Sequence, residues 1–449
     1  MIQKLVFTGS LNKCWIGLGR GMAIALLLTI AACQSEAPPV DTAADDDTTE
    51  PAASPVADGD GLKIGTVLPI TGDLAQYGGP MQDSVSLLVD TVNACGGVLG
   101  QPVTLISEDG QTEPSAGASA MTKLVEVDQV AGVVGAAASS VSSATIDIAV
   151  RNEVVQISPS STSPVFTERA LAGDFDGFWF RTAPPDTFQG IALAELAKEK
   201  GHESVAVLAI NNDYGNGLVE SFGSAFEDLG GAIANDDNPT LYPPDATTFD
   251  SEVIAAFSGS PDAVMIVAYP ETGSLILKSA YEQGLLDGSV DVILTDGMKD
   301  DSVAELVGKT TDGDYIINGL IGTAPSSGGP GLDAFKELYM TQFERDPAVF
   351  DPNSWDAAAL IVLAAELAQS NSGADIKASI TEVSNAPGQD VFDVCEALDL
   401  VRAGEAINFQ GASSTVDLDA QGDVAGSYDI WTIADDGSIE VIDTVSVGG

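Results

Sequence analysis

Short apolar runs rich in β-branched residues recur from Leu62 onward, and each is followed by a longer segment with helical periodicity. In the first part of the chain these runs predict strands at Lys63–Leu68, Val103–Ile106, Val130–Val134 and Val154–Ile157. The segments between them predict helices over Met81–Ala94, Ser115–Val127 and Ser142–Asn152. This alternation is typical of a parallel sheet with helices on both faces.

The same rhythm begins again after Thr182 and predicts a second α/β unit. Its strands are expected at Ser204–Ile210, Ala263–Val267 and Val290–Leu294. Its helices are expected at Phe188–Lys200, Leu218–Leu229, Phe249–Phe257 and Gly273–Gln283. Two consecutive units of this kind predict an α/β protein with two doubly wound parallel-sheet lobes.

The remainder of the chain continues the α/β pattern and ends in a hairpin. We expect a strand at Tyr315–Ile321 and helices at Leu332–Phe343 and Trp355–Gln369. Near the end, Asp435-Asp436-Gly437 separates the apolar runs Ser427–Ile433 and Ile439–Ile442. An Asp-Gly pair between two such runs predicts a β-hairpin.

Small hydroxylated residues fill the loops that follow several of the first-lobe strands. Gly135–Ser143 and Ser158–Pro164 are the clearest examples, and both are rich in serine. Ligands of doubly wound sheets bind at the carboxyl ends of strands. Hydroxyls, backbone N–H groups and helix N-termini at that edge favour an anion. The loops therefore favour a small carboxylate site, with N-capping as the alternative role for the same serines.

The first residues have the features of an export signal. The apolar run Gly21–Ala32 follows a basic segment and has 12 residues, too few to span a bilayer as a helix. It ends in Thr29-Ile30-Ala31-Ala32-Cys33, which resembles a bacterial lipobox. That resemblance implies a lipoprotein signal peptide over 1–32 and lipidation of Cys33, with an ordinary signal peptide as the alternative. No later apolar run reaches the ~18 residues of a membrane span, so we expect membrane attachment by lipid only.

Residues 33–61 are poor in apolar side chains. They include several prolines and the run Asp45–Asp47, but no Lys or Arg. Such a segment cannot bury enough apolar surface to offset the entropy of ordering. We expect a disordered acidic tether.

Two cysteines remain after the leader and the lipidation site are set aside. Cys95 and Cys395 would both lie in an oxidising compartment. A remaining pair of this kind predicts one disulfide, and two separate buried thiols are the alternative.

Charge narrows the possible functions. The chain has 17 Lys plus Arg and 67 Asp plus Glu, a net charge of −50. Such a chain repels phosphate backbones and anionic lipid surfaces, so we expect no nucleic-acid partner. We favour adaptation to a salty medium over an acidic binding surface as the reason for the charge. The one histidine, His202, is expected in a solvated turn, which leaves no His-based metal centre.

Five motifs, in order along the chain, resemble those of one known family. They are LPITGDLAQYGGP, NACGGVLGQPVTLISED, QISPSSTSP, INNDYGNGL and AYPETGSLILKSAYEQG. They are similar to segments of the periplasmic leucine/isoleucine/valine-binding proteins of ABC importers, which have the type I periplasmic binding-protein fold. The resemblance runs from about Leu62 to the C-terminus. The segment Val391–Val424 departs from the usual pattern of this family. It resembles a subgroup of the family that has an extra helix and a GAS-type loop.

The family fold implies two lobes joined by three crossovers. Carried over to this sequence, lobe 1 comprises 62–181 with 325–420, and lobe 2 comprises 182–324 with 421–449. The resemblance also implies a ligand enclosed between the lobes.

The resemblance assigns the binding residues position by position. Tyr77, Tyr214 and Tyr269 match aromatic residues around the ligand, with lobe packing as the alternative for the last two. The matching hydroxyl residues, for the ligand carboxylate and amino group, are Ser139, Ser140, Ser160, Ser161 and Thr162. Asp296 matches the acidic residue that pairs with the ligand ammonium, a position at which the family often has Glu. The alternative role for Asp296 is that of a turn residue before Gly297.

The family therefore implies a monomeric, lipid-anchored solute-binding protein in the periplasm or on the outer face of the cell membrane. It would bind an amino acid, branched-chain or similar, and deliver it to an ABC permease of the inner membrane. We expect no enzymatic activity, no cofactor and no metal, because no histidine or Gly-x-Ser-x-Gly motif accompanies the serines. The alternative is a ligand-sensing lipoprotein for an amide or another small carboxylate, with no transport role.

Overall fold

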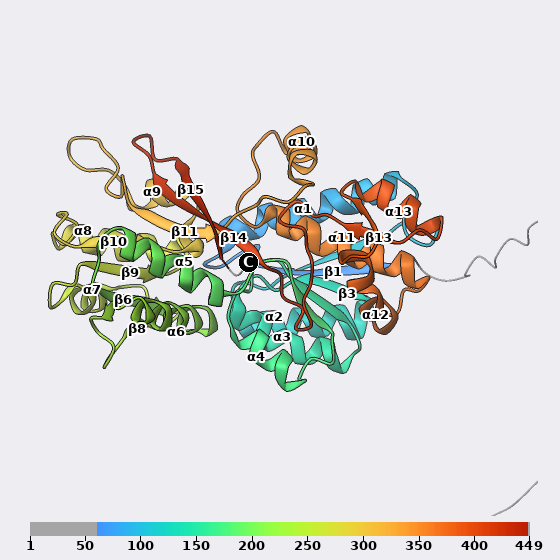
Figure 1. The fold of residues 1–449 in the computed structure, drawn as a ribbon, viewed down its shortest axis with the longest axis horizontal. Helices are drawn as coiled ribbons and strands as arrows, with labels where there is room; N and C mark the ends of the chain where they lie inside the picture. The colour runs from blue at the N-terminus through green and yellow to red at the C-terminus, as the bar shows by residue number, and fades with distance from the viewer. Residues whose placement is uncertain (1–60, 448–449) are drawn as a thin grey trace, which may run out of the picture. The chain divides into compact units, whose positions relative to one another are not determined.

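The computed structural model describes residues 61–447. The predictions for the signal peptide, for Cys33 and for nearly all of the tether concern residues outside this range. Two large sheets organise the described chain, and they occupy separate lobes that lie side by side in Figure 1. A third sheet has only two parallel strands, Gln389–Val391 and Ile407–Phe409. Together with the helices that cover them, the two large sheets confirm the predicted α/β fold class.

The first sheet is entirely parallel. Its strand order is β2-β1-β3-β4-β5, with bounds β1 (Lys63–Leu68), β2 (Thr104–Asp109), β3 (Gly132–Gly135), β4 (Val155–Ser158) and β5 (Trp179–Arg181). The connecting helices are α1 (Ala75–Ala94), α2 (Pro114–Thr122) with the π-helical turn Lys123–Asp128, α3 (Ser139–Arg151) and α4 (Val165–Ala172). Every residue of β3, β4 and β5 is buried, as expected for strands covered on both faces.

The second sheet has eight strands and is mixed. Its order is β15-β14-β11-β10-β9-β6-β7, with β8 beside β6, and the bounds are β6 (Ser204–Ile210), β7 (Ala232–Ile233), β8 (Thr240–Tyr242), β9 (Ala263–Val267), β10 (Asp291–Leu294), β11 (Ile321–Pro325), β14 (Gly426–Ile433) and β15 (Ile439–Val447). Its helices are α5 (Asp186–Glu199), α6 (Asp213–Asp228), α7 (Asp250–Phe257), α8 (Pro270–Glu282) and α9 (Ser302–Val307). The predicted terminal hairpin is confirmed as the antiparallel pair β14 and β15.

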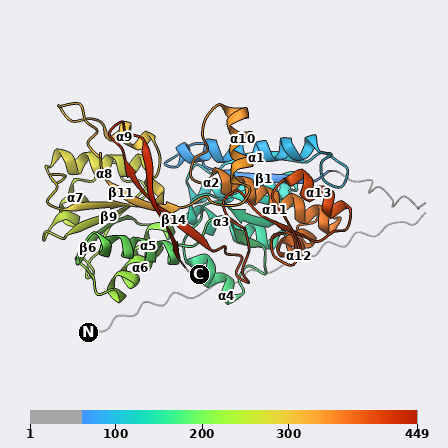
Figure 2. The same ribbon diagram turned by 45° about the horizontal axis from the view of Figure 1, so that its top comes forward.

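The chain passes between the two sheets three times. It leaves the first sheet after β5, leaves the second after β11, and returns at β14. Between the last two passages lie α10 (Leu332–Phe343), α11 (Asp351–Ala368), α12 (Gly373–Ser384), β12 (Gln389–Val391), α13 (Val394–Arg402) and β13 (Ile407–Phe409). Figure 2 shows α11, α12 and α13 on the side of the first sheet, where the almost wholly buried α11 packs against α1. The lobe boundaries drawn from the sequence remain a prediction.

Two local predictions are wrong. Residues 315–320 form turns and a single bridge, and the strand begins only at Ile321. The apolar side chains of Tyr315 and Ile317 are buried because they pack on the core from a loop, which an apolar pattern does not distinguish from a strand. His202 is buried, with 6% of its surface exposed, and its Nε2 lies 3.4 Å from the carboxylate of Asp291.

The helix α1 begins earlier than the pattern predicted. It starts at Ala75 and runs through Gly78, Gly79 and Pro80, residues that normally indicate a break. A Cβ atom on Gly78 would lie 1.9 Å from the carbonyl oxygen of Pro69. The glycine therefore lets the first turn of α1 lie directly against the loop after β1, which brings Tyr77 to the carboxyl edge of the sheet.

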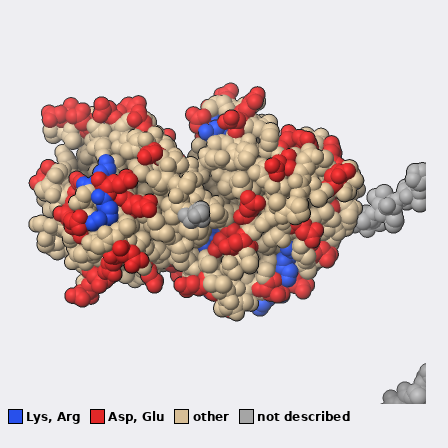
Figure 3. Space-filling model, viewed as in Figure 1, with Lys and Arg blue, Asp and Glu red and all other residues tan. Residues whose placement is uncertain are grey.

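Acidic side chains dominate the surface. Figure 3 shows Asp and Glu scattered over both lobes on the face drawn, and Lys and Arg in a few small groups. The net charge of −50 is thus carried mainly by solvated carboxylates, which repel one another more strongly at low salt than at high salt.

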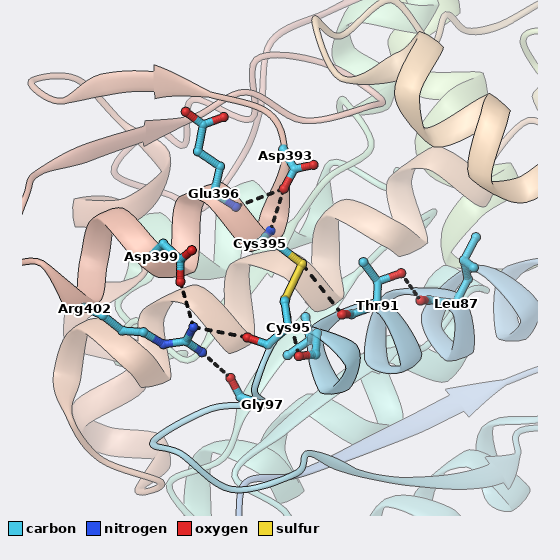
Figure 4. The surroundings of a disulfide bond; sticks show 10 residues. Leu87, Thr91, Cys95, Gly97, Asp393, Cys395, Glu396, Asp399 and Arg402 are labelled. Carbon is cyan, nitrogen blue, oxygen red and sulfur yellow. Dashed lines mark hydrogen bonds and ion pairs between the residues drawn. A yellow bond between two sulfur atoms is a disulfide. The ribbon is translucent and has the colours of Figure 1, made fainter.

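A disulfide joins Cys95, just after α1, to Cys395 at the start of α13, as the leftover pair of cysteines predicted (Figure 4). The side chain of Arg402 supports the same junction by donating hydrogen bonds to the carbonyl oxygens of Cys95 at 3.3 Å and Gly97 at 2.6 Å. The segment that departs from the resembled family is therefore fastened to α1 both covalently and by hydrogen bonds.

Replacing both cysteines with serine should lower the free energy of unfolding. The bond closes a loop of 300 residues, and constraints of this kind contribute roughly 2–5 kcal/mol. Chemical denaturation of the double variant should show a lower midpoint than the oxidised protein, while Arg402→Met alone should cause a smaller loss. Equal stability of the double variant and the oxidised protein would contradict this assignment of the disulfide's role.

Candidate functional site

A cavity lies between the two lobes, at the carboxyl edges of both sheets. Its empty volume is about 350 Å³, and its lining residues are Leu74, Tyr77, Met81, Ala137, Ala138, Ser139, Ser160, Tyr214, Tyr269, Asp296, Gly297 and Phe350. Loops after β1, β3 and β4 supply the first-lobe wall, and residues after β6, β9 and β10 supply the second. This is the position at which doubly wound sheets bind ligands.

Four aromatic rings form most of the apolar wall. Tyr214 and Tyr269 stack with their centroids 5.7 Å apart and their planes 11° apart. Tyr77 meets Phe350 edge to face at 6.1 Å. The family resemblance suggested the three tyrosines but not Phe350, which comes from the segment just before α11 and belongs to no motif. Because all four rings are buried, they give the cavity a rigid surface that suits an apolar group.

Asp296 is the charged group of the cavity. It begins the 3₁₀ turn Asp296–Met298 that follows β10, and only 4% of its surface is exposed. Its Oδ1 accepts hydrogen bonds from the hydroxyl of Tyr214 at 2.6 Å and from Nε2 of Gln189 at 3.0 Å. Burial raises the pKa of this carboxyl, and the two donors act in the opposite direction.

Gly297 is required by the close fit of this turn. A Cβ atom there would lie 2.4 Å from the carbonyl oxygen of Ala268, so a larger residue would push the turn away from β9. The Asp-Gly sequence therefore sets the position of the carboxylate in the cavity, beyond forming a simple turn.

The serine loops contribute two residues to the opposite wall. Ser139 lies at the first position of α3, and its Oγ accepts a hydrogen bond from the backbone N–H of Ser163 at 3.3 Å. Ser160 donates from Oγ to the carbonyl oxygen of Ala137 at 3.1 Å. The residue that caps α3 is Ala138, and no side chain hydrogen-bonds to the amino end of this helix. N-capping therefore does not account for the serine at the start of α3.

Three of the predicted binding residues do not line this cavity. The hydroxyl of Ser161 is buried against the carbonyl oxygens of Ala136 and Ala137, at 3.1 and 3.0 Å. Thr162 is buried behind the wall, with 1% exposed. Ser140 lines a second, more polar cavity, which Asp73, Glu113 and Asp245 also line. Their predicted roles in binding stay predictions.

An ion pair supports the serine loops from behind. Nε of Arg181, at the end of β5, lies 2.6 Å from the carboxylate of Asp423 in the third crossover, and both side chains are almost fully buried. The guanidinium also donates to the carbonyl oxygens of Ser161 and Ser163 at 3.1 and 3.0 Å, and to the hydroxyl of Thr167 at 2.8 Å. One side chain thus fixes a crossover and the loop after β4 together.

Removing Arg181 should destabilise the protein strongly. The Arg181→Met variant leaves the carboxylate of Asp423 buried without its cation, at a cost of about 3–5 kcal/mol in the free energy of unfolding. The double variant Arg181→Met/Asp423→Leu should recover much of this loss, because neither charge remains. Urea denaturation of the three proteins measures both changes. A single variant as stable as the parent chain would contradict the assigned role of the pair.

Two polar residues beside the cavity belong to no recognised motif. Gln189 bonds to Asp296 from the first turns of α5. Asp186, at the start of the same helix, has no exposed surface, and its pKa lies well above the usual range because of burial and of the neighbouring Asp296. The sequence feature that could have drawn attention to Asp186 and Gln189 is their position at the first predicted crossover between the lobes.

Known proteins resemble the chain across both lobes. The family model described as the receptor family ligand binding region matches residues 80–436. The chemotactic signal transduction system substrate-binding protein BasB of Halobacterium salinarum is 26% identical over 400 residues, which are 84% of this chain and 88% of that protein. The Leu/Ile/Val-binding protein homolog 2 of Brucella abortus is 29% identical over 327 residues, 72% of this chain and 82% of that protein.

A solved structure shows the same arrangement of elements. The crystal structure of the leucine binding protein LivK from Thermotoga maritima matches with a TM-score of 0.71 and 25% sequence identity. The match covers 86% of this chain and 99% of that chain.

Proposed function

Because this chain belongs to the receptor ligand-binding-region family, and within it to the type I periplasmic binding proteins of the branched-chain amino acid family, we propose that it binds a free amino acid with an aliphatic side chain. The observation that carries the proposal is the pairing in one small cavity of a single buried carboxylate, Asp296, with a wall of apolar rings. The ligand would lie enclosed between the lobes.

The carboxylate of Asp296 supports an ammonium ligand. A buried carboxylate needs donors or a cation to replace lost water. Tyr214 and Gln189 both bond to Oδ1, and no hydrogen bond from another side chain to Oδ2 is found in the described chain. An ammonium group brings both a positive charge and up to three donors to this position.

The opposite wall suits the ligand carboxylate. Ser139 opens α3, a helix of 13 residues whose positive end faces the cavity without a capping side chain. Ser160 adds a second hydroxyl, which would exchange its hydrogen bond to the carbonyl oxygen of Ala137 for one to the ligand. These neutral donors would bind a carboxylate opposite the site for the ammonium group, and the aromatic wall would enclose an aliphatic side chain.

Replacing Asp296 tests the ammonium site. The Asp296→Asn variant should bind L-leucine at least a hundredfold more weakly, because losing one partner of a buried charge pair costs roughly 3–5 kcal/mol. Its melting temperature without ligand should be unchanged or raised. Isothermal titration calorimetry measures the affinity, first with L-leucine and then with the other amino acids.

Two controls make this experiment specific. Asp287→Asn removes one negative charge from an exposed loop of the same lobe and should bind like the parent protein. The compound 4-methylpentanoate, which is leucine without its amino group, should bind the parent protein weakly. Undiminished binding to Asp296→Asn, or tighter binding of 4-methylpentanoate than of L-leucine, would overturn the ammonium site in favour of a simple carboxylate ligand.

Delivery to an ABC permease from a lipid anchor completes the proposal. Cys33, within the lipobox-like sequence, would hold the protein on the outer face of the membrane. Within residues 61–447 no helix is long and apolar enough to cross a bilayer.

Ligand sensing is the second candidate function, supported by the similarity to BasB, whose name assigns it to chemotactic signal transduction. Loss of amino-acid uptake in cells that lack the protein would favour transport, and loss of chemotaxis alone would favour sensing.

Cys33→Ala should release the protein from membranes or leave an uncleaved precursor. The cysteine is the only acceptor that the lipobox-like sequence offers for a lipid. Fractionation of cells and mass spectrometry of the mature N-terminus give the result, and Cys14→Ala is the matched control. A Cys33→Ala protein that is processed and retained on membranes like the parent would rule out lipidation at this residue.

A further inference from the structure

Gly217 lies in the second turn of α6, where a glycine lowers the stability of the helix. The reason for a glycine here is the close approach of the other lobe. A Cβ atom on Gly217 would lie 2.6 Å from Cδ of Pro164 and 3.0 Å from Oγ of Ser163. Both of these atoms belong to the loop after β4, in the lobe of the first sheet. The missing side chain therefore lets the two lobes approach each other more closely at this point.

The other glycines of α6 have neighbours within their own lobe. A Cβ atom on Gly215 would lie 1.9 Å from the carbonyl oxygen of Ile210, at the end of β6. A Cβ atom on Gly223 would have its nearest neighbour, Cγ1 of Ile233, at 3.7 Å, which is an ordinary van der Waals contact. Gly217 is thus the glycine of α6 whose side-chain space is occupied by the opposite lobe.

A hydrogen bond joins the same two lobes beside Gly217. The hydroxyl of Ser143, in α3 of the first lobe, donates to Oδ2 of Asp213 in the first turn of α6. The carboxylate of Asp213 also lies at the positive end of the α6 dipole, where a negative charge is favourable. We call these four residues, Ser143, Pro164, Asp213 and Gly217, the interlobe contact.

The interlobe contact lies next to the cavity but does not form its wall. Its four residues are not among those that line the cavity, whereas Tyr214, which follows Asp213, and Ser160, in the loop of Pro164, are. An interaction made only when the lobes are closed shifts the balance between open and closed forms by its own free energy. The affinity for a ligand that needs the closed form then changes with it.

We propose that Gly217 sets the affinity for the ligand from outside the cavity, because it lets α6 close against Pro164 while the bond between Ser143 and Asp213 holds the closed position. Gly217, Ser143 and Asp213 are then positioning residues, which act on the ligand through the separation of the two walls. This inference rests on the proposed function, since it takes the ligand to be enclosed between the lobes.

Two glycine variants of the same helix test the proposal. Gly217→Ala and Gly223→Ala each add one methyl group to α6, and each should favour the helix. Gly217→Ala should weaken the binding of L-leucine about tenfold, because the added methyl group overpacks the interlobe contact. Gly223→Ala should bind within about twofold of the parent. Isothermal titration calorimetry measures both, and equal affinities of the two variants would overturn the proposal.

Stability without ligand separates this role from ordinary packing. The added methyl group of Gly217→Ala clashes only while the lobes are closed, and separation of the lobes relieves the clash. The midpoint of urea denaturation should therefore not fall below that of the parent protein, although the affinity does. A fall in stability that accompanies the loss of affinity would assign Gly217 to packing in every form of the folded protein, which would contradict the proposal.

A double-mutant cycle tests the polar half of the interlobe contact. Ser143→Ala and Asp213→Ala should each weaken the binding of L-leucine about fivefold, and together they should cost little more than one alone, because both remove the same hydrogen bond. Ser224→Ala and Asp228→Ala, at exposed positions of α6, are the controls and should bind like the parent. Independent, additive losses would contradict the assigned role of this bond.

Cross-linking tests closure without any ligand. In the variant Ser143→Cys/Asp213→Cys, mild oxidation should join the two lobes at a rate that reflects how often α3 and α6 meet, while Cys95 and Cys395 are already paired. Adding Gly217→Ala should slow this cross-link severalfold, and adding Gly223→Ala should not. Peptide mapping without reduction measures the rate. No cross-link in the parent background, or equal rates with the two glycine variants, would overturn the proposal.

The two kinds of experiment distinguish this inference from the proposed function. If no amino acid binds but Gly217→Ala alone slows the cross-link, the proposed function fails and the role of Gly217 in closure stands. If L-leucine binds to the parent and to Gly217→Ala with the same affinity, the inference alone fails.

Discussion

Burying a carboxylate between two protein lobes costs free energy unless donors or a cation replace the water that it loses. The cavity contains such a group in Asp296, at the point where the second sheet meets the first. Tyr214 and Gln189 supply side-chain hydrogen bonds, backbone N–H groups of the turn contribute further, and the proposed ligand would add the positive charge. The proposed ammonium ligand follows from this one requirement.

Two of the chain's cations pair with carboxylates that are largely buried, where the same cost arises. Arg181 pairs with Asp423 at the third crossover, and Lys299, just after the turn of Asp296, lies 2.8 Å from the carboxylate of Asp429 in β14. Both pairs join segments far apart in the sequence beside the cavity. On the surface, by contrast, Lys and Arg pair with some carboxylates, and the remaining carboxylates are solvated and need no partner, which lets the chain carry a net charge of −50.

The sequence could predict the elements more completely than the contacts of the cavity. Periodicity located most strands and helices, because buried parallel strands are continuous apolar runs. It failed at residues 315–320, where buried apolar side chains belong to a loop. Family resemblance placed Asp296 and the tyrosines at the cavity, but could not show that Ser161 turns its hydroxyl to the backbone. Phe350 and Asp186 lie outside every motif, since tertiary packing alone brings them there.

Neutron diffraction from crystals grown with L-leucine in deuterated medium would test the central claim most directly. The account predicts deuterons of the ligand ammonium directed at the bare carboxylate of Asp296. A deuteron on Asp296, or an ammonium group that points away from Asp296, would contradict it.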